Sequence, residues 1–185
     1  MILAVWILIH TTVYTIVFGI FGAIASLFES RKGKIFGYCA RVWARLIVLS
    51  AFLKVEVEGL EKLDTNSNYI FCSNHGSMFD VPILFYSLPF WMVPIAKIEV
   101  KKIPLLGLVM TAGGHIFVDR SNHEKAILSM RNAKQQLLEG DKSIMLFPEG
   151  SRSKDGTIKP FKRGGLIIAI ESEVPVVPIA IINSH

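Results

Sequence analysis

The sequence predicts an α/β domain at residues 54–185, with a largely parallel mixed sheet flanked by helices, after a helical segment at residues 1–53. Three observations lead to this prediction. Short apolar runs alternate with segments of helical periodicity, which is typical of βα units. Polar side chains follow four of these apolar runs, as expected where parallel strands end at one edge of a sheet. The first 28 residues contain no Asp, Glu, Lys or Arg, unlike the rest of the chain.

The N-terminal segment predicts a helix that associates with a membrane. Residues 1–28 would form a helix about 42 Å long, which exceeds the roughly 30 Å of a bilayer core. A cleaved signal peptide fits poorly, because such a peptide begins with basic residues and has a shorter apolar core. Basic residues follow directly, at Arg31, Lys32, Lys34, Arg41 and Arg45. They favour the cytoplasmic side and anionic headgroups, with an ordinary solvated helix face as the alternative.

Residues 1–53 can meet a membrane in two ways. Residues 1–28 could cross the bilayer alone, or pair with a helix at residues 35–53 in a hairpin that enters one leaflet. Gly19 and Gly22 permit close packing against a second helix. Polar residues, which are costly in a bilayer core, interrupt the apolar run near its middle: His10, Thr11, Thr12 and Thr15. We therefore predict the hairpin, with both ends on the cytoplasmic face of the cell membrane.

Local patterns predict the elements of the α/β domain. Residues 54–58, KVEVE, alternate strictly before Gly59 and predict a strand. Further strands are predicted at Tyr69–Cys72, Trp91–Ala96, His115–Val118, Ser143–Phe147 and Val174–Ile182. A helix should begin at Ser121, where Glu124 completes a capping box, and end at Gly140. Other helices are expected after Ser77, Val100 and Lys162.

Composition narrows the classes of partner and cofactor. The net charge of +5 lies entirely beyond residue 28, so the α/β domain is basic and suited to nucleic acid, anionic lipid or phosphate. The apolar segment favours lipid over nucleic acid. No Walker loop, GxGxxG, HExxH or CxxC motif is present, so we expect no nucleotide and no metal site. His115 and His123 are interpreted as structural, and Cys39 and Cys72 as free thiols.

Polar side chains collect at the carboxyl ends of four predicted strands. Asn74, His75 and Asp80 follow the first of these strands, Lys97 the second, Asp119 and Arg120 the third, and Glu149 and Arg152 the fourth. In an open α/β sheet such ends share one edge, which is where ligands bind. The sequence therefore predicts a site at this edge.

The residue types at this edge indicate a reaction. A neutral histidine is a common general base, and a carboxylate on its second ring nitrogen orients it. Positions i and i+5 lie about 140° apart on a straight helix, so contact requires His75 in a loop and Asp80 in the first helical turn. Lys97, Arg120 and Arg152 suit a phosphate. No Ser or Cys stands out as a nucleophile, which favours direct attack by a substrate hydroxyl. The alternatives are a structural histidine and a loop ion pair between Glu149 and Arg152.

Four segments, in order, resemble the sequence blocks of the glycerolipid acyltransferase family. NHGSMFD matches the H-x4-D block at His75 and Asp80, and GGHIFVDR resembles the second block, which ends at Arg120. FPEGSRS resembles the third, with Glu149, Gly150 and Arg152, and VPVVPIAI resembles the fourth. The segment AKIEVKKIPLLG also resembles a family segment and supports Lys97 as a phosphate contact. The likeness covers residues 55–182.

The resemblance implies a glycerol-3-phosphate acyltransferase-like fold and a membrane-bound O-acyltransferase. Such an enzyme moves a fatty acyl group from acyl carrier protein or coenzyme A to 1-acyl-sn-glycerol-3-phosphate, giving phosphatidic acid without a further cofactor. It also implies that His75 is the general base, that Asp80 orients it, and that substrate contacts come from Lys97, Arg120, Glu149, Gly150 and Arg152. An N-terminal helix pair seats bacterial members on the membrane, and residues 1–53 resemble that pair.

Two other functions fit the same residues. One is acyl transfer to another lysophospholipid or to a lyso-aminolipid. The other is a non-catalytic membrane protein that binds a lipid phosphate, although pure binding does not require a base such as His75. Family members usually continue for some tens of residues beyond the fourth block, so we expect the α/β domain at residues 54–185 to be truncated at its C-terminus.

Overall fold

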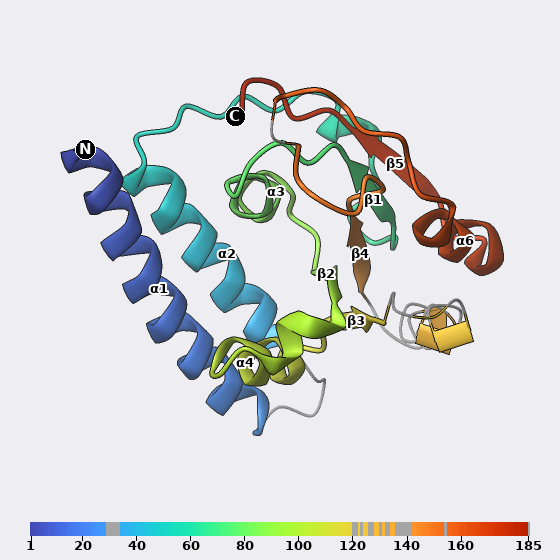
Figure 1. The fold of residues 1–185 in the computed structure, drawn as a ribbon, viewed down its shortest axis with the longest axis horizontal. Coiled ribbons are helices and arrows are strands. Elements are labelled where there is room, and N and C mark those ends of the chain that lie inside the picture. Colours follow the sequence, from blue (N-terminus) through green and yellow to red (C-terminus); the bar gives the residue numbers. More distant parts are fainter. Residues whose placement is uncertain are drawn as a thin grey trace.

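A computed structural model describes residues 1–28, 34–119, 142–153 and 155–184, with single residues and pairs between 122 and 135. Arg120 and most of the helix predicted from Ser121 to Gly140 lie outside the described residues. The other elements form a sheet with helices on both faces, preceded by a helical hairpin (Figure 1).

The sheet has the order β3-β2-β4-β1-β5, and all four pairings are parallel. Its strands are β1 (Ile70–Ser73), β2 (Met92–Lys97), β3 (Ile116–Val118), β4 (Ser143–Leu146) and β5 (Val176–Ile179). The register pairs Ile70 with Ile144 on one side and with Val176 on the other. Strand β4 lies between two neighbours and is buried along its whole length, as expected for a central parallel strand. The order follows from tertiary packing, because local patterns carry no information on which strands pair.

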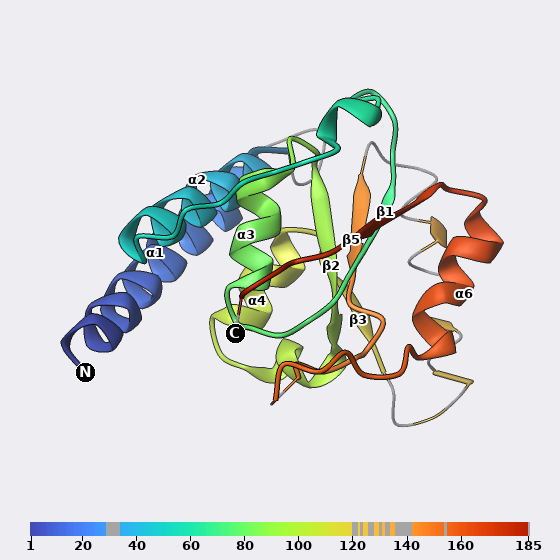
Figure 2. The ribbon, with the colours of Figure 1, turned by 90° about the horizontal axis from the view of Figure 1, so that it is seen from above.

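Successive side chains on β1 and β4 enter two separate cores. Ile70 and Ile144 pack with Ile168 of α6 (Arg163–Ser172) on one face of the sheet. Phe71 and Met145 point to the other face, where they pack against α3 (Asp80–Ser87). This alternation is the two-residue period of a strand. Figure 2 shows α6 on one side of the sheet and α1, α2, α3 and α4 on the other.

The N-terminal segment is a pair of antiparallel helices that lie side by side in both ribbon views (Figures 1 and 2). They are α1 (Ile2–Ser26) and α2 (Lys34–Ser50). Helix α2 also packs on α3, with Ala44 fully buried in the core beneath the sheet. Helix α1 is long and apolar enough to span a bilayer by length and composition, and most of its side chains are exposed.

The two glycines of α1 face different helices. A Cβ atom on Gly22 would lie 3.0 Å from the ring of Phe36, so this glycine permits the predicted approach of α2. A Cβ atom on Gly19 would instead lie 3.0 Å from Val109 of α4 (Leu106–Ala112). The small-residue patch therefore joins α1 to α4 as well as to α2, which the sequence analysis did not anticipate.

Two predicted strands differ in the structure. Residues 54–58 form no strand, because nothing in the described part of the chain pairs with them and Val57 is 44% exposed. They are an extended connection between α2 and the short 3₁₀ helix η1 (Leu60–Lys62). Their alternating side chains are therefore exposed or only partly buried. Strand β5 is shorter than predicted, since only Val176–Ile179 pair with β1 at the sheet edge. Both cysteines are free, and burial raises the pKa of each thiol.

Candidate functional site

His75 and Asp80 meet at the carboxyl end of β1. His75 lies in the loop after the strand and Asp80 begins α3, which is the arrangement that the i,i+5 spacing required. The ring atom His75 Nδ1 lies 2.7 Å from Asp80 Oδ2, and the Ser77 N–H donates to the same oxygen at 2.8 Å. The N-terminus of α3 adds a favourable dipole for the carboxylate. The predicted contact between the two side chains is therefore present.

The environment of Asp80 keeps its carboxyl group ionised. Burial opposes ionisation, but the hydrogen bonds from His75 and Ser77 outweigh it and hold the pKa of Asp80 below its ordinary value of 3.8. Because folding lowers this pKa, the pair stabilises the fold at neutral pH. That contribution is lost as the pH falls below 3.8 and through the folded-state pKa.

The imidazole of His75 is oriented for proton transfer. When Nδ1–H donates to Asp80, Nε2 carries the free lone pair and can act as a base. The ring stacks on Phe147, directly after β4, with centroids 4.0 Å apart and planes inclined by 19°. The side chain of His75 is 17% exposed, so the ring is held on one side and accessible on the other. The role of Phe147 was not predicted, because an apolar residue at a strand end has no distinctive sequence signal.

Glu149 joins two loops through its buried carboxylate. The side chain is 2% exposed. Its Oε1 accepts the His75 N–H at 2.8 Å, and its Oε2 accepts the Lys159 N–H at 3.1 Å. The Ser153 N–H in turn donates to the His75 carbonyl at 2.7 Å. Glu149 is thus a positioning residue for His75, and its carboxylate contacts backbone N–H groups in place of the ion pair with Arg152 that the sequence left open.

Asn74 fixes the segment that follows β5. Its side-chain amide donates to the Ile181 carbonyl at 2.9 Å, and its Oδ1 accepts the Ile181 N–H at 2.8 Å. One side chain therefore substitutes for a neighbouring strand and holds residues near the C-terminus beside the His75 loop. The sequence analysis placed Asn74 at this edge without assigning it a role.

A polar cavity of about 660 Å³ opens beside His75. Its lining includes Lys97 at the end of β2, together with Gly150, Ser151, Arg152 and Ser153. Lys97 and Arg152 are exposed, and neither side chain forms an ion pair with a carboxylate among the described residues. Gly150 adopts a φ of 74°, which favours glycine at the turn that presents this loop. The structure thus brings together two of the predicted anion contacts, Lys97 and Arg152. The third, Arg120, lies outside the described residues.

Lys159 is a further cation in the same loop. Its ammonium group donates to the Arg152 carbonyl and, at 3.3 Å, to Ser151 Oγ. The loop is closed by Asp155, which accepts hydrogen bonds from Ser153 and Thr157. Led by those from Thr157, these hydrogen bonds lower the pKa of Asp155 to about 2. The side chains of Arg152 and Ser153 are therefore carried on a constrained loop.

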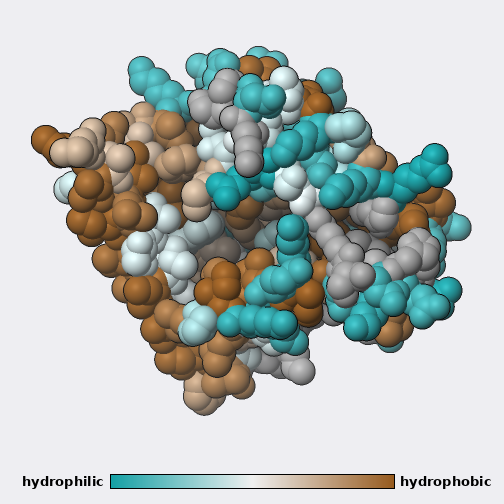
Figure 3. Space-filling view, in the orientation of Figure 1, coloured by the Kyte–Doolittle hydropathy of each residue, from teal (hydrophilic) through white to brown (hydrophobic). Residues whose placement is uncertain are grey.

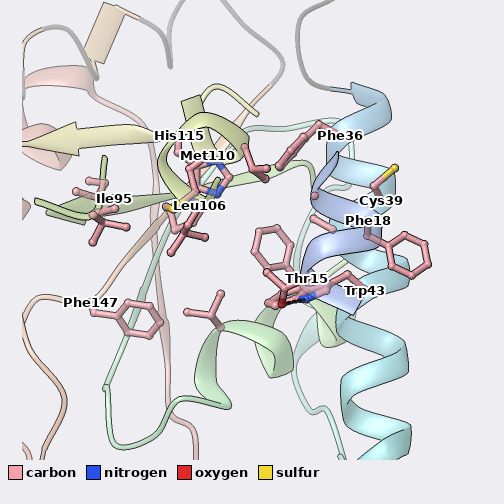
Figure 4. A pocket seen from close by; sticks show the side chains of 18 of the residues that line it. Thr15, Phe18, Phe36, Cys39, Trp43, Ile95, Leu106, Met110, His115 and Phe147 are labelled. Carbon is pink, nitrogen blue, oxygen red and sulfur yellow. Dashed lines mark hydrogen bonds between the residues drawn. The ribbon is translucent and has the colours of Figure 1, made fainter. Parts of the chain in front are cut away.

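An apolar cavity of about 340 Å³ also borders His75. Figure 4 shows side chains that line it. It is lined by side chains from α1, α2, α3, β2 and α4, among them Phe18, Trp43, Phe85, Leu106 and Met110. The Trp43 Nε1–H donates to Thr15 Oγ1 at 3.0 Å and so ties α2 to α1 at this wall. The apolar and polar cavities share His75, Ile95, Val100 and Phe147. The lining of the apolar cavity is spread over distant segments, and the sequence analysis did not predict it.

His115 also lines the apolar cavity. Burial, aided by the nearby charge of Lys142, lowers the pKa of His115 to about 4, although a hydrogen bond with the Met110 backbone opposes this shift. The imidazole is therefore neutral near pH 7. Among the described residues no three His, Cys, Asp or Glu side chains cluster in a way that could hold a metal ion.

Comparison with known proteins gives the family. A family model described as Acyltransferase matches residues 54–182, which contain every described residue of the predicted site. The chain belongs to the acyltransferase family. A 1-acyl-sn-glycerol-3-phosphate acyltransferase from Limnanthes alba is 36% identical over 155 residues, covering 84% of this chain and 53% of the relative. The alpha form from Homo sapiens is 39% identical over 127 residues, covering 69% and 45%.

A solved structure extends the likeness to the N-terminal helices. The crystal structure of the 1-acyl-sn-glycerophosphate (LPA) acyltransferase PlsC from Thermotoga maritima matches with a TM-score of 0.77 and 28% identity. The match covers 96% of this acyltransferase chain and 71% of that one. The chain spans about half the length of the plant and human relatives above.

Replacing Glu149 by Gln should destabilise the acyltransferase and misplace its histidine. In the native protein each carboxylate oxygen of Glu149 accepts one backbone N–H. A Gln amide has only one acceptor oxygen, so its NH₂ group would face the other N–H, which would lose its acceptor. We expect Glu149→Gln to lower the free energy of unfolding by about 1–3 kcal/mol, the cost of a buried unsatisfied donor. Chemical denaturation would measure this loss.

The matched control is Glu171→Gln, which makes the same change at an exposed site on α6 and should stay within about 0.5 kcal/mol. Equal stabilities for the two variants would contradict the positioning role of Glu149.

Proposed function

We propose that the chain is a 1-acyl-sn-glycerol-3-phosphate acyltransferase that forms phosphatidic acid. The observation that carries this proposal is the position of His75, at the junction of a cationic cavity and an apolar cavity. The acceptor and the acyl donor are both suited to such a junction, since each joins a charged group to a fatty acyl chain. The names of the relatives support the same reaction.

The orientation of His75 supports the following proposed reaction. Nε2 takes the proton of the glycerol 2-hydroxyl as the oxygen attacks the thioester carbonyl, and Asp80 stabilises the imidazolium that forms. The new C–O bond then replaces the C–S bond, and the departing thiolate receives the proton from His75. The thioester, on acyl carrier protein or coenzyme A, is a co-substrate, and we propose no further cofactor.

We propose that the two cavities hold different parts of the substrate. Lys97 and Arg152 would hold the acceptor phosphate, with Arg152 offering a bidentate fork and Arg120 a further predicted contact. A fatty acyl chain would lie in the apolar cavity, whose side chains remove it from water. The decisive assay is formation of phosphatidic acid from 1-acyl-sn-glycerol-3-phosphate and an acyl thioester, run beside other lysophospholipids and a lyso-aminolipid. Transfer to those acceptors alone would overturn the proposed substrate.

Replacing His75 by Ala should abolish transfer without removing acceptor binding. General-base catalysis contributes about 10²–10⁴-fold, so we expect kcat to fall by this factor while the Kd for the acceptor changes little. Asp80→Asn should lower kcat in the same direction, because the imidazolium loses its counter-charge. Turnover and acceptor binding would be measured on the same folded preparations. Retention of more than half the original turnover by His75→Ala would rule out this residue as the base.

Replacing Arg152 by Ala should act on the phosphorylated acceptor. Loss of a charge-assisted contact costs about 1.5–3 kcal/mol, so the KM for the acceptor should rise by roughly 10–150-fold. The KM for the acyl thioester serves as the internal control and should change little. Arg152→Lys should restore only part of the affinity, since Lys lacks the fork. A variant with an unchanged acceptor KM and impaired donor binding would show that Arg152 contacts the donor.

We also propose that α1 and α2 hold the enzyme at the cytoplasmic face of a membrane as a hairpin. Helix α1 packs on α2 and α4, so a perpendicular crossing by α1 would draw the α/β domain toward the bilayer core. The hydroxyl groups of α1 do not distinguish the hairpin from a crossing helix. Thr12 and Thr15 donate to carbonyls one turn earlier at 2.7 Å, so their hydroxyls already have partners within the helix. Arg45 is exposed and can reach headgroups, whereas Arg41 donates to the Pro89 carbonyl at 2.9 Å.

A cysteine near the start of α1 distinguishes the hairpin from a crossing helix. Ile2 is 87% exposed, and Ile2→Cys should react with an impermeant maleimide only after bacterial spheroplasts are opened. Ile170→Cys, on α6 of the α/β domain, is the matched control and should behave identically. Labelling at position 2 but not at position 170 in intact spheroplasts would establish a crossing helix.

A further inference from the structure

We propose that the connection from η2 to α4 is a second membrane-inserting element, separate from the α1–α2 hairpin. It consists of η2 (Ile98–Lys102), residues 103–105 and α4 (Leu106–Ala112). Three apolar side chains on it are exposed: Ile103 by 48%, Leu105 by 42% and Leu108 by 67%. We call these three side chains the apolar ridge. The inference extends the proposed function, since an acyltransferase that acts on lipids must receive them from a bilayer.

The segment is apolar on both of its faces. Val100, Leu106, Val109 and Met110 line the apolar cavity beside His75, while the apolar ridge faces outward. A helix that is apolar all round is either buried in protein or in contact with lipid. Here protein covers only the inner face, so the segment separates the apolar cavity from the surroundings of the ridge.

The ridge continues the exposed apolar surface of α1. The close approach of Gly19 to Val109 fixes α4 against α1. Near this contact α1 exposes Phe21 by 61% and Ile24 by 53%. Figure 3 shows an extensive hydrophobic surface on this side of the molecule. Contiguous apolar surface of this kind is rare on soluble monomers and marks an interaction site.

The backbone of the segment is strained at Leu105, one of the exposed residues of the ridge. Its φ of 61° and ψ of −54°, with the Leu106 N–H donating to the Pro104 carbonyl at 2.7 Å, form the rare classic γ-turn. Gly107 follows, where any Cβ would lie 2.0 Å from the Lys101 carbonyl oxygen. Strained backbone of this type concentrates at functional positions. Here the strained residue, Leu105, carries an exposed apolar side chain.

The charges beside the ridge favour a bilayer as its partner. Lys101 and Lys102 are exposed at its start, with Glu99 as the one exposed acidic neighbour in η2. Lys101 also lies over the Phe117 ring, 5.7 Å from its centroid. Lysines next to inserted apolar side chains extend toward anionic headgroups. Lysine is depleted at the cores of protein interfaces, which argues against a protein occupant of the same surface.

The test measures the depth of position 108 in a bilayer. An environment-sensitive dye is attached to Leu108→Cys in the full chain, with Cys39→Ala and Cys72→Ala removing the other thiols. Phosphatidylglycerol-containing vesicles should shift the dye emission to the blue, and nitroxide-bearing lipid chains should quench it. The matched control is Ile170→Cys, which is 78% exposed on α6 at the opposite side of the molecule (Figures 1 and 2). Its dye should show neither effect.

A dye at position 108 that stays open to aqueous iodide on vesicle-bound protein would overturn the proposal. A Leu105→Asn/Leu108→Asn variant gives a second, functional measurement. It should retain transfer to a short-chain acceptor in detergent and lose transfer to acceptor embedded in vesicles. Equal activity in both assays would also overturn the proposal. The depth measurement is independent of catalysis, so it distinguishes a failure of this inference from a failure of the proposed reaction.

Discussion

The structure of the site depends on one buried carboxylate, that of Glu149. Its two oxygens accept the backbone N–H groups of His75 and Lys159, which belong to loops after different strands. Through this group the loop after β4, which carries Arg152, is tied to the loop after β1, which carries His75. A buried charge is stable only when such hydrogen bonds replace its water. The spacing of His75 and Arg152 is therefore set by backbone contacts rather than by direct contact of the two side chains.

This arrangement places two unlike environments beside one imidazole. The polar cavity contains Lys97 at the end of β2 and Arg152 on a constrained loop, and the apolar cavity is built from helices and from β2. Under the proposed function, an amphiphilic substrate would satisfy both only with its junction of head and tail at His75. Polarity would then select the position along the substrate, and stacking on Phe147 restricts the orientation of the His75 ring.

The N-terminal helices form part of the wall of the apolar cavity, in addition to extending from the α/β domain. Helix α1 contributes Phe18 and α2 contributes Trp43 to the apolar cavity, so removing residues 1–53 would open the cavity to solvent. The same two helices and α4 carry the exposed apolar surface. The exposed apolar surface and the lining of the apolar cavity are therefore opposite faces of one thin layer of helices, so the proposed membrane contact and the proposed acyl site lie close together.

Sequence alone determined the βα alternation, the uncharged N-terminal helix and the residues at the strand ends, because periodicity, charge and strand-end position are local properties. It also determined that His75 and Asp80 could meet, since both lie within one short turn. It could not recognise that residues 54–58 have no partner strand in the described part of the chain, because alternation does not depend on pairing. Only the tertiary structure decided the strand order, the two amide contacts of Glu149 and the apolar cavity. Each of these joins segments that are distant in the chain, and their contacts arise from packing that no local pattern records.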